Sequence, residues 1–166
     1  MRAVARAIAT VGYVGLLRPA PGTWGSAAAL PLAALVWWLG GALALTVACG
    51  VAYALGHWAT AVCIEGTDDK DPSEIVIDEL AGQWIALLPV AWGAERVGAS
   101  AFDLWPGWVA AFVLFRLFDI WKPGPVGWAD RMGGATGVML DDVVAGLLAA
   151  LGVVALAALA HLVFLA

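Results

Sequence analysis

The chain has 166 residues, 63% of them hydrophobic and 13% charged, with a mean hydropathy of +0.92 and a formal net charge of -5. Soluble domains are closer to half apolar and a quarter charged, so the composition excludes an ordinary soluble domain. It predicts a single membrane-embedded domain over residues 1–166. The chain has no basic stripe, which argues against a nucleic-acid partner.

Residues 1–18 combine three arginines with a modest apolar run. Arg18, Pro19 and Pro21 interrupt this run, and long apolar segments follow at once, so we do not interpret it as a cleaved signal peptide. The pattern predicts an amphipathic helix lying on the cytoplasmic membrane surface.

The sequence from Pro21 to Ser26, Pro-Gly-Thr-Trp-Gly-Ser, predicts a rigid turn followed by a helix start. Thr23 or Ser26 would cap this helix. Free N–H groups and the helix dipole favour an anion at such a start. Thr23 and Ser26 are therefore candidate ligands for a substrate phosphate.

Residues 27–64 are almost continuously apolar. A single helix of that length would measure roughly 57 Å, nearly twice the hydrocarbon thickness of a bilayer. The pair Gly40-Gly41 offers a break, so we expect helices at about 22–39 and 42–64. Whether the first of these fully spans the membrane, tilts or re-enters is left open.

An acidic stretch follows. We interpret residues 65–71 as a solvated loop, and Pro72 and Ser73 as the start of a helix that runs from about Ser73 to Val97. Four acids fall on or beside its first turns: Asp71, Glu74, Asp78 and Glu79. Carboxylates at one-turn spacing repel one another, and this cost rises beside a membrane. A hard cation such as Mg²⁺ prefers oxygen ligands of this kind.

A fourth helix is expected from about Phe102 to Ile120, ended by Pro123. Near its end, Arg116 and Asp119 are three residues apart and can face each other, and Lys122 follows one turn after Asp119. The glycine-rich loop at 128–137 contains two further charged residues, Asp130 and Arg131.

The last apolar helix is expected to run to Ala166. Near its start stand Asp141 and Asp142. One carboxylate is enough to cap a helix, so two adjacent ones entering a span suggest a further role.

These segments predict an all-α, polytopic membrane bundle of about five helices. With the N-terminus inside, the acidic segments and the Pro21 turn all lie at the cytoplasmic face, as the positive-inside rule favours. Arg96 is the exception.

The groups collected at this face suit a metal ion plus a phosphate, and their position suggests a lipid headgroup. We expect the metal ligands to come from Asp71, Glu74, Asp78, Glu79, Asp141 and Asp142. The candidate catalytic residues are Glu74, Asp78, Glu79 and Asp142. The candidate substrate-binding residues are Thr23, Ser26, Arg116, Lys122, Asp130 and Arg131. Metal-activated water is the favoured mechanism, and an aspartate nucleophile stays open.

Taken together, these motifs resemble the phosphatidylglycerophosphatase A family, in the same order from Pro21 to Gly146. The motifs are Pro21–Ser26, Asp71–Gly82, Phe115–Pro123, Asp130-Arg131 and Gly133–Gly146. The resemblance implies a multi-pass enzyme of the bacterial inner membrane that depends on Mg²⁺. It also implies conversion of phosphatidylglycerophosphate to phosphatidylglycerol and inorganic phosphate.

A different class of protein also fits part of the pattern. Acids in membrane segments mark ion pathways, so a small ion-coupled membrane carrier with an acidic cation site is the alternative. The acids lie at span ends on one side, and no inverted repeat is visible, which disfavours a carrier. The sequence leaves the oligomeric state and the number of metal ions open.

Overall fold

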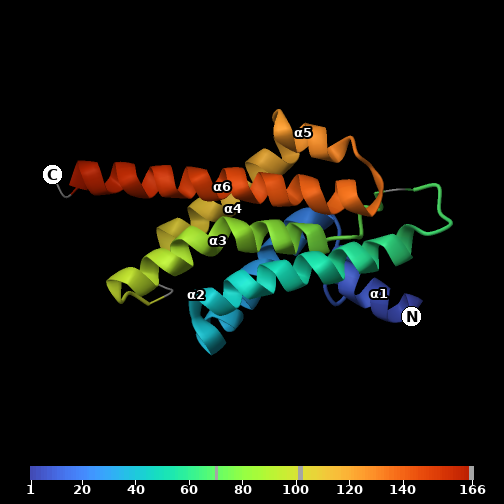
Figure 1. Ribbon diagram of the computed structural model, residues 1–166, viewed down its shortest axis with the longest axis horizontal. Helices are drawn as coiled ribbons and strands as arrows, with labels where there is room; N and C mark the ends of the chain where they lie inside the picture. The colour runs from blue at the N-terminus through green and yellow to red at the C-terminus, as the bar shows by residue number, and fades with distance from the viewer. Residues whose placement is uncertain (70, 101–102, 165–166) are drawn as a thin grey trace.

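The computed structural model describes residues 1–69, 71–100 and 103–164, and this part of the chain is all-helical (Figure 1). Its elements are α1 (Arg2–Ala9), the 3₁₀ turn η1 (Val14–Leu16), α2 (Pro21–Ile64), α3 (Ile77–Val97), α4 (Trp105–Trp121), α5 (Pro125–Asp130) and α6 (Gly134–Phe164). The expected all-α class is confirmed.

Helix α2 is a hairpin broken at Gly40 and Gly41, where the backbone leaves helical geometry. A side chain on Gly25 would touch Val76, and one on Gly56 would touch Ile77, the next residue along the chain. In one straight helix those two glycines would lie roughly 46 Å apart, so the two halves must fold back on each other. Figure 1 shows this reversal, and the backbone break lies at the glycine pair, as predicted.

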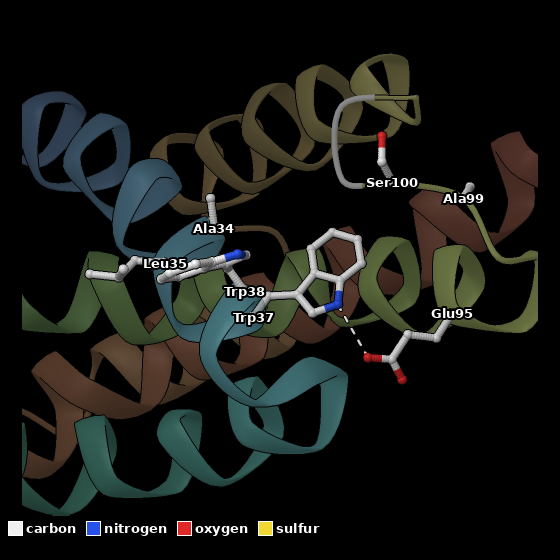
Figure 2. Close-up of a pocket in the computed structure, with 7 residues that line it drawn as sticks. All are labelled: Ala34, Leu35, Trp37, Trp38, Glu95, Ala99 and Ser100. Carbon is white, nitrogen blue, oxygen red and sulfur yellow. Dashed lines mark hydrogen bonds between the residues drawn. The ribbon is translucent and has the colours of Figure 1, made fainter.

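The carboxylate of Glu95, near the end of α3, fastens this break (Figure 2). Its Oε1 accepts hydrogen bonds from the indole of Trp37 at 3.2 Å and from the backbone N–H of Ala42 at 2.5 Å. It therefore satisfies a donor at the start of the second half-helix, as a capping side chain does. Trp37 also stacks on Trp108 of α4.

Helix α3 is the centre of the bundle, packed against α2 and α6 and, less extensively, α4. Its contact with α6 is close because both helices present a glycine. A Cβ on Gly82 would lie 2.5 Å from the carbonyl oxygen of Asp142, and one on Gly146 would collide with the Gly82 carbonyl. Small residues of this kind let helix backbones approach in membrane proteins.

Two helices of the described chain are long and apolar enough to cross a membrane: α2, and α6 over Gly134–Val163. With 63% hydrophobic residues overall, they make this a membrane-associated protein. Helix α3 carries charged residues at both ends, and α4 has only 17 residues, which is short for a bilayer crossing.

Several expected boundaries need correction. The N-terminal helix ends at Ala9, because residues 11–13 have positive φ angles and break it. Helix α2 begins at Pro21, the usual place for a first-turn proline, so neither Thr23 nor Ser26 caps it. Helix α3 begins only at Ile77, so Ser73 does not cap it either.

The region after α4 holds more helix than expected. Helix α5, which Pro125 begins, extends into the expected loop at 128–137, and α6 already starts at Gly134. Helix α4 starts at Trp105, with a proline in its first turn. The expected start at Phe102 and end at Ala166 lie outside the described residues.

Candidate metal and phosphate site

The acidic ends of α3 and α6 meet at one end of the bundle. One carboxylate oxygen from each of Asp78, Glu79 and Asp142 lies within 4.8 Å of the other two. The glycine contact described above brings α6 against α3 here, since the Asp142 carbonyl packs directly on Gly82. Residues far apart in sequence thus form one cluster.

This cluster has the properties of a cation site. Asp78 and Asp142 are buried, with Asp142 only 2% exposed. Within the described residues, Glu79 Oε2 and Asp142 Oδ2 are buried with no hydrogen-bond partner. Buried carboxylates this close cannot all be charged without a compensating cation, and unpartnered buried oxygens are costly. The three side chains therefore fit a hard divalent ion, which takes such oxygens as ligands.

Arg116 reaches the cluster from α4. Its guanidinium pairs with Asp119 at 2.7 Å, as their spacing predicted, and Nη1 donates to Ser26 Oγ at 3.4 Å. Ser26 is fully buried and donates in turn to the carbonyl of Gly22 at 2.9 Å. The arginine is thus fixed in place, while its Nε is buried without a partner among the described residues.

Lys122 follows α4 with a left-handed backbone, φ 47°. Its ammonium group donates to Asp141 at 2.7 Å and also to Asp130 of α5. Partial burial by itself lowers the pKa of Lys122, but the hydrogen bonds to Asp130 and Asp141 outweigh it and raise the pKa above the ordinary value. Lys122 therefore stays charged.

These groups line one cavity of about 240 Å³. Its charged lining residues are Asp71, Asp78, Glu79, Arg116, Asp119, Lys122, Asp141 and Asp142. Six acids thus face two bases, so a phosphate would meet net repulsion there unless a cation were bound as well.

Some candidate residues lie elsewhere. Glu74 pairs with Arg6 of α1 at 3.3 Å and does not join the cluster. Thr23 and Arg131 do not line the cavity. Asp130 is not a lining residue either, but it forms an ion pair with Lys122, which is. Glu74 lies outside α3 because that helix starts at Ile77, and Asp130 and Arg131 lie at the end of α5, a helix that the sequence did not predict.

The sequence analysis also missed a residue. Gly22 lines the cavity, and a Cβ there would collide with Glu79 Oε1 and lie 3.3 Å from Arg116 Nη1. A glycine next to a proline at a helix start is the available signal, but by itself that pattern indicates only a turn.

The fold and the site define a membrane-associated helical protein with a buried carboxylate cluster and two bases around one cavity. The family model for phosphatidylglycerophosphatase A matches residues 7–157. The chain therefore belongs to the phosphatidylglycerophosphatase A family, as the sequence motifs predicted, and this membership supports a phosphatase activity.

Two of three similar curated proteins carry the name of this family. A phosphatidylglycerophosphatase A from Escherichia coli is 38% identical over 144 residues, covering 84% of this chain and 76% of that protein. One from Haemophilus influenzae is 35% identical over 146 residues, covering 86% and 82%. A putative phosphatidylinositol-3-phosphatase from Bacteroides thetaiotaomicron is 38% identical over 138 residues, covering 76% and 77%. No solved structure matches the chain significantly.

Proposed function

We propose that this protein hydrolyses phosphatidylglycerophosphate to phosphatidylglycerol and inorganic phosphate, with Mg²⁺ as cofactor. It would do so from the cytoplasmic face of a bacterial inner membrane. The observation that carries the proposal is the buried cluster of Asp78, Glu79 and Asp142, with unpartnered oxygens, in a chain of this family. The carrier alternative gains no support from any relative.

Asp78, Glu79 and Asp142 would hold the ion, with Asp71 and Asp141 lining the same cavity. When bound, Mg²⁺ supplies positive charge that offsets the phosphate and activates water. The sequence also makes Glu74 a candidate metal ligand and catalytic residue, but in the structure it forms an ion pair with Arg6 and lies outside the cluster.

The two bases would orient the substrate phosphate. Arg116 is held by Asp119 and Ser26, and Lys122 by Asp130 and Asp141, so both present charge at fixed positions. Hydrolysis forms a bond from water oxygen to phosphorus and breaks the ester bond to glycerol, whose oxygen takes a proton. A nearby carboxylate receives the proton that water loses.

The test is phosphate release by purified protein in detergent, where no ion gradient exists. We expect turnover of phosphatidylglycerophosphate that is lost in excess EDTA and restored by Mg²⁺. Full turnover in rigorously metal-free buffer would contradict the metal mechanism. No phosphate release under any metal condition would contradict the enzyme assignment.

The Bacteroides relative supplies a second substrate to compare, because its name refers to phosphatidylinositol 3-phosphate. Both lipids carry a phosphate monoester that the same site chemistry would attack. We expect a higher kcat/KM for phosphatidylglycerophosphate, which agrees with the family and with two relatives. The reverse preference would reassign the substrate and leave the site chemistry in place.

A further inference from the structure

The segment before α2 is attached to the residues that lead into α3. The N–H of Val76 donates to the carbonyl of Ala9, at the end of α1, at 2.8 Å. The guanidinium of Arg18 donates to Ser73 Oγ at 3.1 Å. Val76 is fully buried and immediately precedes α3, whose second and third residues are two of the clustered acids.

Two further contacts join the same parts. Arg6 pairs with Glu74 at 3.3 Å. Gly15 of η1 packs so closely on the Glu74 carbonyl that a side chain there would collide with it. Residues 73–76 therefore rest on α1 and η1, and the position of α3's first turn depends on that support.

The outer side of this N-terminal segment is apolar and basic. Its exposed large side chains are Met1, Val4, Tyr13, Leu16 and Leu17. No Asp or Glu occurs before Glu65, while Arg2, Arg6 and Arg18 all fall within the first 18 residues. Within the described chain, Arg2 and Arg18 form no ion pair, so their charge is available to an outside partner.

Connectivity places this surface at the edge of the membrane. Arg18 stands three residues before Pro21, where the apolar helix α2 begins. Figure 1 shows α1 at the same end of the bundle as the loop after α2 and the start of α6. Exposed apolar side chains mixed with arginine suit the headgroup region of an anionic bilayer.

We propose that residues 1–18 bind the anionic surface of the surrounding bilayer, and that this contact holds residues 73–76 and so the first turn of α3. The partner is the phosphate-bearing headgroup layer, with apolar side chains inserted between lipids. The proposal does not rest on the phosphatase assignment, because neither readout below needs turnover.

The first experiment locates the surface. A fluorophore is attached to Val4→Cys in full-length protein lacking Cys49 and Cys63, reconstituted in nanodiscs with phosphatidylserine. We expect quenching by headgroup-nitroxide lipid and protection from aqueous iodide. The matched control, a label at Asp68→Cys in the loop after α2, should show the opposite pattern.

The second experiment measures the coupling by hydrogen exchange of the 73–77 backbone amides. In wild type, replacing phosphatidylserine by phosphatidylcholine should speed this exchange on the order of tenfold. Val4→Asp should do the same even with phosphatidylserine present, because the new charge is repelled by the anionic surface. Val4→Leu, which keeps an apolar side chain, should behave as wild type.

Either experiment can overturn the proposal. A Val4 label quenched only by iodide would show that the segment faces water, and protection from both quenchers would indicate a protein partner or a second copy. Unchanged wild-type exchange between the two lipid compositions would contradict the coupling, whether or not Val4→Asp folds.

Discussion

At the residue scale, the unpartnered oxygens of Glu79 and Asp142 indicate that the cluster needs a bound cation. Glu79→Gln and Asp142→Asn keep shape and remove one charge each. We expect each to abolish most turnover, and the double variant to be little worse than either single one, because ligands of one ion act as a unit. Phosphate release against Mg²⁺ concentration is the measurement.

The melting temperature of these variants is the folding control, and the direction of its change can be predicted. In metal-free buffer each should melt at or above the wild-type temperature, since one buried repulsion is removed. Saturating Mg²⁺ should raise the wild-type Tm by roughly 5–10 °C and the variants' much less. Glu65→Gln and Asp69→Asn, in the exposed loop, should match wild type. If those loop variants fail instead, the site has been placed at the wrong end of the acidic stretch.

Lys122 occupies a position where its backbone conformation is unfavourable, so its side chain must have a role there. Its left-handed backbone would suit glycine better, so the ammonium group has a use that outweighs the strain. Lys122→Ala should lower kcat/KM by about tenfold or more, as expected when one charge-assisted contact is lost. Lys122→Arg should retain more activity. Wild-type kinetics in the alanine variant would remove Lys122 from the site.

At the element scale, the contact between α3 and α6 sets the spacing of the acids. Gly146→Ala forces a methyl group against the Gly82 carbonyl, and we expect it to cost about 1–3 kcal/mol and to move Asp142 away from Glu79. Turnover and the Mg²⁺-induced rise in Tm should both fall. Gly93→Ala, in α3 with open space around it, is the matched control and should be neutral or slightly stabilising.

Some of these elements can be predicted from local sequence patterns, and others cannot. Length and a glycine pair were enough to predict the α2 hairpin, because no 44-residue helix fits a bilayer. Charge in apolar segments placed Asp78, Glu79 and Asp142 among six candidate metal ligands, but it did not separate them from the other three. The start of α3 was misplaced because the Val76 amide is taken by Ala9, a partner 67 residues away that no local pattern reveals.

The late start of α3 also explains why Glu74 does not share a face with Asp78. Spacing alone put it on one face with Asp78, which holds only inside a helix, and the helix begins three residues later. Gly22 was missed because its role depends on how closely Glu79 approaches, a tertiary distance. The sequence thus predicts which chemical groups are present, and tertiary packing decides which of them come together in one site.

At the scale of the whole molecule, the distribution of charge predicts orientation. Among the described residues, six arginines and lysines gather at the acidic end, and Arg96 is the only arginine or lysine at the other end. The six are Arg2, Arg6, Arg18, Arg116, Lys122 and Arg131. The positive-inside rule then predicts that the acidic site faces the cytoplasm and that the loop after α3 lies outside. That loop includes Ser100, and the loop after α2 includes Asp68.

Single cysteines test this orientation in cells. Asp68→Cys and Ser100→Cys are made separately in protein lacking Cys49 and Cys63, which without either addition is the unlabelled control. A membrane-impermeant maleimide should label the Ser100 variant in intact spheroplasts and the Asp68 variant only in inverted vesicles. The α2 hairpin returns the chain to its starting side, so the three N-terminal arginines and Asp68 must share one side. Labelling of Asp68→Cys in spheroplasts would therefore invert the whole bundle and place the acidic site outside the cell.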